Sequence, residues 1–494
     1  MKKRSYILAL DCGTSSVRSI VFDLAGAPVS CVARSVKLEY PVPGYVQQNA
    51  EEIWTKQISA AYEAITSAEI SAEEIAAIGI TNQRETAVAW DKKTGQPLAP
   101  AIVWQCRRTA ERCERLAGSP EMETIREKTG LVADPYFSAT KFEWMLENVP
   151  GLRERAERGE VAFGTVDSWL LYRLSGGKVF ATDLSNASRT MLCDIRTGKW
   201  DESLCSLFGI PVSALCEIRP SSGVFCETEP NLLGAAIPVC GVAGDQQSAL
   251  FGHGCVEAGE LKNTYGTGGF LLMNTGSAPK LDRKGGLLST VAWQQNGEIT
   301  YALEGSVFVC GAAVQWLRDG ISIIRHSADS EELARSVPDS GGVYMVPAFT
   351  GLGAPYWNSS ARGAILGITR GTQRGHIARA TLEALAYQTV DVVREMERVT
   401  GERVRSLRVD GGAAANGLLM QIQADVLGVP VRRPEYAEIT ARGAAMLAAL
   451  GVGAIASPGE FLAGEKISVF EPQISEERRR EMLDGWHDAV RRVL

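Results

Sequence analysis

Two polar turns, one in each half of the chain, limit what this sequence can fold into more than any other feature. The first is DCGTSSVR at residues 11–18 and the second is NTYGTGG at residues 263–269, and each joins two β-rich runs. A plain hairpin needs only a pair of turn residues such as Asn-Gly, so these glycines and hydroxyls exceed what chain reversal requires. Each half also has an apolar strand that ends in an acid, Asp11 or Asp245. This repetition predicts two related α/β domains that face each other.

The pattern of strands and helices in each half agrees with this duplication. In the first half we expect three antiparallel strands at residues 6–11, 18–24 and 29–38, a helix at 51–67 and a buried strand at 76–81. In the second half we expect a long helix at 377–399, a strand ending at Asp410, and a helix from Gly417 to Gly428. Because 494 residues are too many for one core, we place one domain at residues 1–244 and another at 245–494.

Composition excludes several classes of protein. The net charge is −7 with no basic run to offset it, which argues against nucleic-acid binding. The 11 cysteines are scattered without a C-x-x-C pair, and the four histidines lack ligand spacing, so we expect reduced thiols and no zinc site. The apolar stretch at residues 6–10 is too short for a signal peptide, and no run approaches the roughly 18 residues of a membrane span. We therefore expect a cytoplasmic protein without membrane insertion.

The conventional nucleotide-binding motifs are absent from the sequence. No Walker A motif and no protein-kinase signature occurs. GVGAIA at residues 451–456 fits a dinucleotide pattern, but it follows a helix-like run instead of a strand, so we interpret it as a helix terminus.

The two turns could instead form a clamp for a triphosphate. Small residues let backbone N–H groups approach phosphates, and the hydroxyls of Thr14, Ser15 and Ser16 with the charge of Arg18 add donors. In the ordinary alternative, these hydroxyls only satisfy local backbone groups. The first turn alone does not decide between the two, and the second turn at an equivalent place favours the clamp.

Three further sites have both an ordinary and a functional interpretation. In DGGAAAN, Asn416 could cap a helix, or the glycines could form a flat surface for a base or ribose. Arg84 and Glu85 could form a surface ion pair or grip hydroxyl groups. Asp245 could cap a helix or accept a proton from a substrate hydroxyl during phosphoryl transfer.

Taken together, these residues resemble the carbohydrate-kinase family that shares the actin and hexokinase-type ATPase fold, and within it the branch that phosphorylates glycerol. The resemblance covers nearly the whole chain, and its most specific stretches are GITNQRET, AIVWQCRRTAE, DPYFSATK, FGTVDSWL, TDLSNASRTML, AGDQQSALFG, KNTYGTG, VPAFTGLGAPYW, ARGAILGITRG and RVDGGAAAN. It implies two actin/ribonuclease H-like α/β domains with an active-site cleft between them. It also implies transfer of a phosphoryl group from Mg·ATP to glycerol, giving sn-glycerol 3-phosphate, by a homo-oligomer (dimer or tetramer).

The same resemblance implies roles for individual residues. Those that would hydrogen-bond the glycerol hydroxyls are Arg84, Glu85, Tyr136, Asp245 and Gln246, with Trp104 and Phe270 as walls and Asp245 as general base. Those that would contact the ATP phosphates are Thr14, Ser15, Ser16, Arg18 and Thr267, while Gly311, Gln315, Gly412 and Asn416 would line the nucleotide site. Asp11 would orient Mg²⁺ through water.

The sequence departs from the family pattern in places. Bacterial relatives usually carry Gln at the position of Cys12 and a hydroxyl residue at the position of Val17. The family's effector loop for fructose 1,6-bisphosphate reads EPNLLGAAIP here, without its arginine, and SSGVFCETEP lacks the histidine that some relatives phosphorylate. We therefore expect no control by that sugar phosphate or by phosphocarrier protein.

Two alternatives stay open from the sequence. One is a kinase for another short polyol or sugar, because a difference of one methylene discriminates by only about 1–3 kcal/mol. The other is an actin-like, nucleotide-driven assembly or chaperone module that has no small acceptor.

Overall fold

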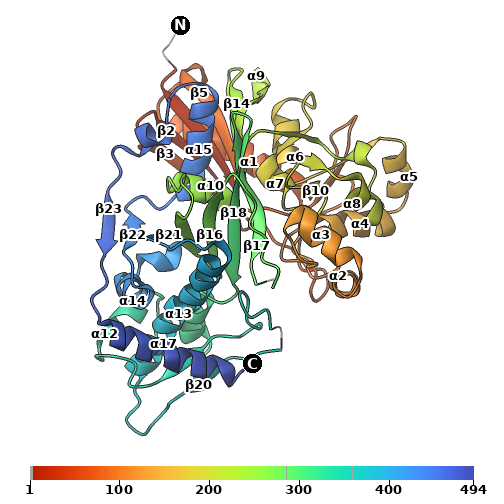
Figure 1. The fold of residues 1–494 in the computed structure, drawn as a ribbon. Helices are drawn as coiled ribbons and strands as arrows, with labels where there is room; N and C mark the ends of the chain where they lie inside the picture. The colour runs from red at the N-terminus through yellow and green to blue at the C-terminus, as the bar shows by residue number, and fades with distance from the viewer. Residues whose placement is uncertain (1–3, 285, 359) are drawn as a thin grey trace.

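Two twisted β-sheets form the centre of the molecule. The computed structural model describes residues 4–284, 286–358 and 360–494 (Figure 1). The strands of the first sheet, in spatial order, are β13 (Ser222–Glu227), β14 (Pro238–Gly244), β5 (Ile75–Asn82), β1 (Tyr6–Cys12), β2 (Ser16–Asp23) and β3 (Pro28–Ser35). Those of the second sheet are β17 (Leu288–Gln295), β18 (Glu298–Val307), β16 (Gly269–Gly276), β15 (Leu261–Tyr265), β21 (Leu407–Asp410), β22 (Val431–Pro434) and β23 (Ile467–Phe470).

The two sheets repeat one topology. In the first, β1 pairs with β2 and β2 with β3 in antiparallel fashion, while β1 pairs with β5 and β5 with β14 in parallel. In the second sheet, β15 pairs with β16 and β16 with β18 in antiparallel fashion, while β15 pairs with β21 and β21 with β22 in parallel. Strands β15, β16, β18, β21 and β22 therefore correspond, in this order, to β1, β2, β3, β5 and β14. Both polar turns therefore connect the first two strands of equivalent sheets. The predicted duplication and the α/β fold class are confirmed.

Helices cover and separate the two sheets. Helix α1 (Ala50–Ser67) packs on β2 and β3, whereas α15 (Ile439–Gly451) packs on the other face of that sheet, against β1, β5 and β14. Helix α10 (Asp245–Gly252) contacts α15 on one side and β15 and β16 of the second sheet on the other. Helices α13 (Arg374–Thr400) and α14 (Gly417–Leu427) pack on the second sheet. One hydrophobic core containing Ala9, Leu250, Leu272 and Ala445 thus joins both sheets through α10 and α15.

Very close backbone contacts hold α15 in this place. A Cβ atom added at Gly443 would lie 1.8 Å from the Ser248 carbonyl oxygen of α10, and one at Gly79 would lie 2.1 Å from the Ala444 carbonyl oxygen. Only glycine allows such an approach. Although α15 lies late in the chain, it therefore belongs to the packing of the first sheet. The division into residues 1–244 and 245–494 stays a proposal.

A smaller lobe is inserted between β5 and β13 and lies beside the two sheets (Figure 1). Its hydrophobic core includes Phe137, Phe142 and Phe163. Its helices are α2 (Ala110–Ala117), α3 (Glu121–Thr129), α4 (Ser138–Asn148), α5 (Leu152–Glu157), α6 (Val166–Leu174), α7 (Leu184–Ala187) and α8 (Glu202–Leu207). Its short strands include the pair β6 (Val88–Asp91) and β8 (Val161–Gly164). This lobe supplies several side chains to the cleft described below.

The remaining helices lie near the second sheet or at the edges of the molecule. They are α9 (Pro230–Leu233), α11 (Gly311–Asp319), α12 (Asp329–Arg335), α16 (Pro458–Leu462) and α17 (Glu476–Arg491). Short paired strands complete the fold: β4 (Gln47–Gln48) with β7 (Ala101–Ile102), β9 (Ala181–Asp183) with β12 (Glu217–Arg219), β10 (Cys193–Asp194) with β11 (Lys199–Trp200), and β19 (Tyr344–Val346) with β20 (Ala364–Leu366).

Local signals explain the helix ends that were predicted. The Asn416 side chain accepts a hydrogen bond of 2.9 Å from the Leu419 N–H and so caps α14, and Gly428 ends this helix with φ of +81°. The run before GVGAIA is α15, which ends at Gly451, so the interpretation as a helix terminus is confirmed. Within the ranges described above, none of the helices is both long and apolar enough to cross a membrane.

Candidate active site

Two cavities open beside the β15–β16 hairpin, and Thr267 at its turn lines both of them. The first, of about 500 Å³, is bounded by the hairpin turn, α11 and the loop after β21, and we call it the glycine-lined cavity because Gly266, Gly311 and Gly412 line it. The second, of about 670 Å³, lies on the other side of Thr267 against the inserted lobe. We call it the aromatic cavity because Trp104, Tyr136 and Phe270 line it.

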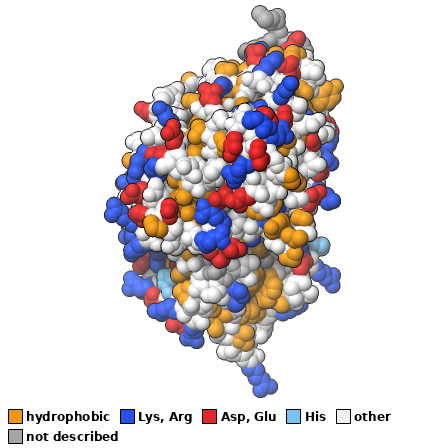
Figure 2. Space-filling model, turned by 90° about the vertical axis from the view of Figure 1, so that its right-hand side faces the viewer, with side chains coloured by type: hydrophobic (Ala, Val, Ile, Leu, Met, Phe, Trp, Pro, Cys, Tyr) orange, Lys and Arg blue, Asp and Glu red, His pale blue; other side chains and the backbone are white. Residues whose placement is uncertain are grey.

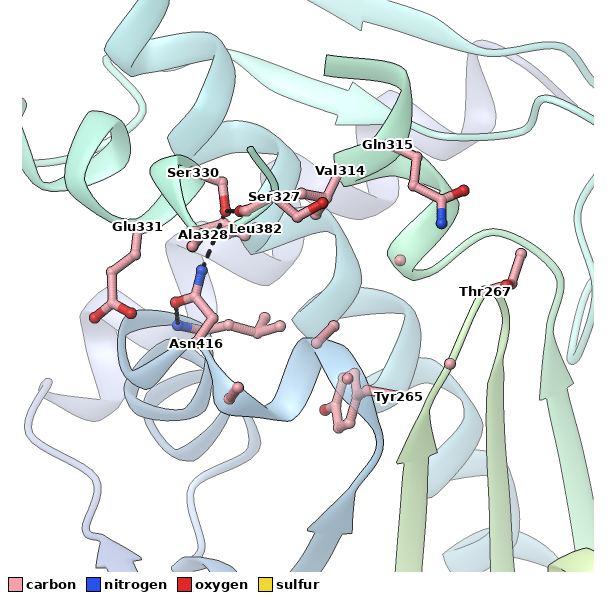
Figure 3. Close-up of a pocket in the computed structure, with 16 residues that line it drawn as sticks. Tyr265, Thr267, Val314, Gln315, Ser327, Ala328, Ser330, Glu331, Leu382 and Asn416 are labelled. Carbon is pink, nitrogen blue, oxygen red and sulfur yellow. Dashed lines mark hydrogen bonds between the residues drawn. The ribbon is translucent and has the colours of Figure 1, made fainter. Parts of the chain in front are cut away.

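The four residues predicted to line the nucleotide site, Gly311, Gln315, Gly412 and Asn416, all line the glycine-lined cavity. Thr267, predicted to contact the phosphates, lines it as well. Figure 3 shows Thr267 and Gln315 on one side of this cavity and Ser330 and Asn416 across from them, with Asn416 Nδ2 donating a hydrogen bond of 3.4 Å to Ser330 Oγ. The third wall is formed by Ser327, Ala328, Ser330 and Glu331, and no pattern in the sequence indicated it.

Glycines leave this cavity open where a nucleotide would need space. A Cβ atom added at Gly412 would meet nothing within 4 Å, whereas one at Gly311 would lie 2.7 Å from the carbonyl oxygen of Gly266. Gly412 therefore faces free space, and Gly311 holds α11 against the hairpin turn. The size and the small, donor-rich lining fit an adenine nucleotide.

The aromatic cavity is walled by three rings that meet edge to face. The Trp104 ring centroid lies 5.5 Å from that of Tyr136 and 6.4 Å from that of Phe270. Trp104 Nε1 also donates a hydrogen bond of 2.9 Å to Thr14 Oγ1, so this wall is tied directly to the first polar turn. Thr14 and Ser15 line the cavity as well, whereas Ser16 and Arg18 line neither cavity among the residues described.

Behind the aromatic cavity lies a buried cluster of four charges, which we call the Arg84 cluster: Arg84, Glu85, Arg189 and Glu304. Their side chains are at most 1 % exposed. The Glu304 carboxylate forms ion pairs with both arginines: Oε2 lies 2.5 Å from Arg84 Nη1, and Oε1 lies 3.0 Å from Arg189 Nη2. Arg189 Nε also lies 2.7 Å from Glu85 Oε1. Arg84 and Glu85 are therefore not a surface ion pair. Two guanidinium groups balance two carboxylates, which is what burial of charge requires.

The Arg84 cluster orients groups toward the cleft. Arg84 Nη2 donates a hydrogen bond of 2.9 Å to the Tyr136 hydroxyl, and Arg84 Nε lies 3.3 Å from Asp245 Oδ1. Burial would raise the pKa of Glu304, but the two guanidinium groups outweigh it and lower that pKa to about 2. Burial raises the pKa of Glu85 despite Arg84 and Arg189. The backbone of Glu85 has φ of +60°, an unfavourable conformation that clusters at functional sites.

Asp245 is the first residue of α10, and its side chain is 31 % exposed. Like Arg84, Glu85 and Gln246, it is not among the residues that line the two cavities. Its Oδ1 accepts a hydrogen bond of 2.7 Å from the Gln246 N–H. Burial raises the pKa of Asp245, and Arg84 opposes that change. Gly244 is the N-cap residue of α10 and no side chain among the residues described caps this helix, so Asp245 does not act as a helix cap. Because its pKa is raised, the partly exposed carboxylate is more basic than an ordinary aspartate.

Asp11 and Arg18 lie together at the end of the first hairpin. Arg18 Nη1 is 3.5 Å from Asp11 Oδ2 and 3.4 Å from Glu438 Oε2, which comes from the segment just before α15. Burial raises the pKa of Asp11 to about 7, with Arg18 opposing and Glu438 and Asp245 adding to the rise. Cys12 beside it is fully buried, and burial raises its thiol pKa, so this thiol is unreactive.

A magnesium ion carried by ATP fits this corner of the cleft. Such an ion keeps several waters and needs only one or two protein carboxylates. The buried Asp11 carboxylate, with Glu438 and Asp245 as like-charged neighbours, would be stabilised by a cation. Within the described ranges, no group of three or more His, Cys, Asp or Glu side chains could by itself hold a metal ion, so a cation here would rely on the phosphates for its other ligands.

Sequence reasoning found fewer than half of the residues that line the two cavities, and two of the four members of the buried Arg84 cluster, Arg84 and Glu85. Glu304 and Arg189 were not predicted, although an acid within the apolar run of β18 is a signal that was available. Lys262 in β15 is also fully buried beside Gln246. Figure 2 shows Lys and Arg interspersed with Asp and Glu on the face drawn there, without an extended basic surface.

Both halves of the chain match models of one protein family. The N-terminal domain of the FGGY family of carbohydrate kinases matches residues 6–252, and the C-terminal domain of that family matches residues 261–452. The chain belongs to the FGGY family of carbohydrate kinases. The resemblance and the actin/hexokinase-like fold class stated from the sequence are thereby confirmed.

The relatives described next match this chain over nearly its full length, and each is named a glycerol kinase. A glycerol kinase of Carboxydothermus hydrogenoformans is 55% identical over 492 residues, covering 99% of this chain and 98% of the relative. Glycerol kinase 2 of Thermotoga maritima is 55% identical over 490 residues, covering 99% of each. The solved structure of Plasmodium falciparum glycerol kinase with ADP superimposes with a TM-score of 0.93 at 35% identity, covering 100% of this chain and 99% of that one.

Proposed function

We propose that this protein transfers the γ-phosphoryl group of ATP to glycerol, giving sn-glycerol 3-phosphate and ADP. The observation that carries the proposal is Asp245, a partly exposed carboxylate with a raised pKa. It lies 3.3 Å from Arg84, whose guanidinium also binds Tyr136 in the wall of the aromatic cavity. Full-length relatives at 53–55% identity are named glycerol kinases, which supports glycerol as the acceptor.

In this proposal the aromatic cavity holds the polyol. Trp104 and Phe270 would pack against its carbon chain, while Arg84, Glu85, Tyr136, Asp245 and Gln246 would hydrogen-bond its hydroxyls. Arg84 is already fixed by Glu304 and Tyr136, so its guanidinium loses little freedom when it binds a hydroxyl.

Asp245 would be the general base. Its carboxylate takes the proton of the acceptor hydroxyl as that oxygen forms a bond to the γ-phosphorus, and the bond from phosphorus to the β,γ-bridging oxygen of ATP breaks. A carboxylate whose pKa is raised by burial is a better proton acceptor than an exposed one. Phosphoryl transfer depends mainly on positioning and charge neutralisation, so one base is sufficient.

The ATP site would be the glycine-lined cavity, with the phosphates directed toward the two polar turns. Gly311, Gln315, Gly412 and Asn416 would contact the nucleoside, and Thr14, Ser15, Ser16, Arg18 and Thr267 the phosphates. Asp11 would hold Mg²⁺ through water, and the bound ion would neutralise charge on the phosphate oxygens. We also propose, from the family resemblance, a cytoplasmic homo-oligomer (dimer or tetramer), which light scattering of the purified protein would test.

The test is whether ADP release requires glycerol and yields glycerol 3-phosphate. In the Asp245→Asn variant we expect kcat to fall by at least about 100-fold, while ATP affinity, measured by calorimetry, stays near that of the wild type. The exposed Asp488→Asn serves as the matched control and should keep full activity. Near-normal turnover of Asp245→Asn would refute the role of this residue.

A panel of acceptors tests the first alternative. Rates with glycerol, dihydroxyacetone, erythritol and xylulose separate a glycerol enzyme from a kinase for a longer polyol or sugar. Structures of a gluconate kinase and a xylulose kinase from Lactobacillus acidophilus share the fold at 20% identity, and that likeness says nothing about the acceptor. If the rate of ATP hydrolysis is the same with and without each polyol, the result would instead favour the assembly or chaperone module.

A further inference from the structure

Lys262, in the middle of β15, is a buried cation to which the proposed function gives no role. Its side chain is fully buried. A buried lysine costs free energy unless its ammonium group is well hydrogen-bonded. Its partners should therefore reveal why a lysine is present there.

The Lys262 ammonium group has three partners, and they come from three elements around the cleft. Lys262 Nζ donates to Gln246 Oε1 in the first turn of α10. It also donates to Thr264 Oγ1 at 2.8 Å and to the Phe270 carbonyl oxygen at 3.2 Å. An ammonium group has three N–H donors, so all three are used.

These contacts decide how the Gln246 side chain is oriented. A glutamine amide has one accepting oxygen and one donating nitrogen, and either can face a given neighbour. Oε1 accepts from the Lys262 ammonium group, which has donors but no acceptor. A flipped amide would place the Nε2 donors against that ammonium group, so the amide keeps its observed orientation. Gln246 Nε2 makes no hydrogen bond to any residue in the described ranges, and Gln246 adjoins Asp245 in the cleft.

Charged groups surround Lys262 on the elements packed against it. Asp245 lies on α10, Asp410 at the end of β21, Arg84 after β5 and Glu304 on β18. Asp410 is also paired with His253 at 2.7 Å. Burial lowers the pKa of Lys262 to about 8, and Asp410 and Asp245 limit that change. At neutral pH the group is therefore protonated and keeps three donors.

We propose that Lys262 is a positioning residue for the acceptor: it locks the Gln246 amide so that Nε2 donates a hydrogen bond to a hydroxyl oxygen of the polyol. The same ammonium group fixes the backbone of Phe270, which walls the aromatic cavity. This inference rests on the proposed function and adds to it the reason that Gln246 recognises a hydroxyl as a donor.

The experiment compares Lys262→Met with Lys262→Arg and with the exposed control Lys466→Met, whose side chain is 78 % exposed in the native protein. Lys262→Met removes the group that orients the Gln246 amide, so we expect the KM for glycerol to rise about tenfold, as for the loss of one hydrogen bond to the polyol. The KM for ATP should change by no more than about twofold. Lys262→Arg keeps charged donors and should restore most of the glycerol affinity. Equal effects on both substrates would overturn the inference.

Gln246 variants test the same inference in a chain that keeps Lys262. Gln246→Glu still accepts from Lys262 but lacks the N–H donor, and we expect the same rise of about tenfold in the KM for glycerol as in Gln246→Ala. Adding Lys262→Met to Gln246→Ala should then raise the KM no further, because both changes remove one interaction. A wild-type KM in Gln246→Glu, or an additive double variant, would refute the inference.

The wild type in the same assay separates this result from the proposed function. If wild-type protein shows no glycerol-dependent ADP release, the proposed function fails. If the wild type turns over and Lys262→Met has an unchanged KM for glycerol, only the role of Lys262 fails.

Discussion

At the residue scale, the Arg84 cluster explains how an arginine can be buried behind the aromatic cavity. Glu304 contacts both Arg84 and Arg189. Removing the charge of Glu304 would leave two guanidinium groups against one buried carboxylate. We expect Glu304→Gln to lower the free energy of unfolding by about 3–5 kcal/mol, measured by thermal or urea unfolding.

A matched control separates this burial effect from a loss of charge in general. Glu111 pairs with Arg115 one helical turn away, and its side chain is 86 % exposed. Glu111→Gln should cost no more than about 0.5 kcal/mol. Equal losses in the two variants would contradict the importance of the buried cluster.

The same residue predicts how stability depends on pH. The pKa of Glu304 is lowered from 4.5 to about 2 in the folded protein, so unfolding takes up a proton between these values. Its contribution to stability is complete above pH 4.5 and is lost as the pH falls toward 2. Unfolding free energies from pH 7 to pH 3 should therefore fall less steeply in Glu304→Gln than in the wild type. Parallel curves would contradict this.

Sequence reasoning found two members of the Arg84 cluster and missed the other two. Arg84 and Glu85 were found because they are adjacent after an apolar strand, a pattern visible within a few residues. Glu304 and Arg189 contact them across 220 and 104 positions of sequence. No local sequence pattern indicates such a contact, because these residues come together only when the two sheets and the inserted lobe have packed.

At the element scale, the loop between β21 and α14 depends on two adjacent glycines for different reasons. Gly411 has φ of +87°, and a Cβ atom there would lie 2.6 Å from the Tyr265 carbonyl oxygen. Gly412 would place a Cβ atom in open space within the glycine-lined cavity. Gly411→Ala should therefore destabilise the protein by about 1–3 kcal/mol, whereas Gly412→Ala should leave the melting temperature unchanged.

ATP binding distinguishes the two variants further. Gly412→Ala should weaken ATP binding without loss of stability, because its methyl group occupies space that the nucleotide would need. Calorimetric titration with ATP and differential scanning calorimetry provide the two measurements. A stable Gly411→Ala variant would show that the loop can move away from Tyr265.

Elements were predictable where their signal is local. The hydroxyl-rich turns, the long helix α13 and the Asn416 cap follow from spacing within a few residues, and the structure has them within a few positions of the prediction. The placement of α15 was not predictable. This helix comes late in the chain but packs on the first sheet, where Gly79 and Gly443 allow the close backbone contacts. Such contacts cannot be predicted from sequence, because a glycine does not show which segment of backbone will approach it.

At the scale of the whole molecule, Thr267 lies where the two cavities meet, and groups from both sheets face each other there. Arg18 from the first sheet reaches Glu438 from the second half of the chain. If the space around Thr267 closed over both substrates, it would keep water from acting as acceptor.

Residues 229–238, where the family resemblance predicts the loop for a sugar bisphosphate, contain no arginine, lysine or histidine. Residues 229–238 form the short helix α9 and the turn after it, and their one charged side chain is Glu229, which pairs with Lys178. A bisphosphate needs arginine or lysine donors for tight binding, and residues 221–230 contain no histidine for a phosphocarrier protein to modify.

We therefore expect an excess of fructose 1,6-bisphosphate to leave the glycerol-dependent rate unchanged, measured as formation of glycerol 3-phosphate. Added ADP is the positive control, because it would occupy the glycine-lined cavity and must lower the rate in the same assay. Size-exclusion elution with and without the sugar bisphosphate should also coincide, since no contact between subunits would be bridged by it. A marked fall in rate, or a shift toward larger assemblies, would mean that cations outside residues 229–238 form an effector site.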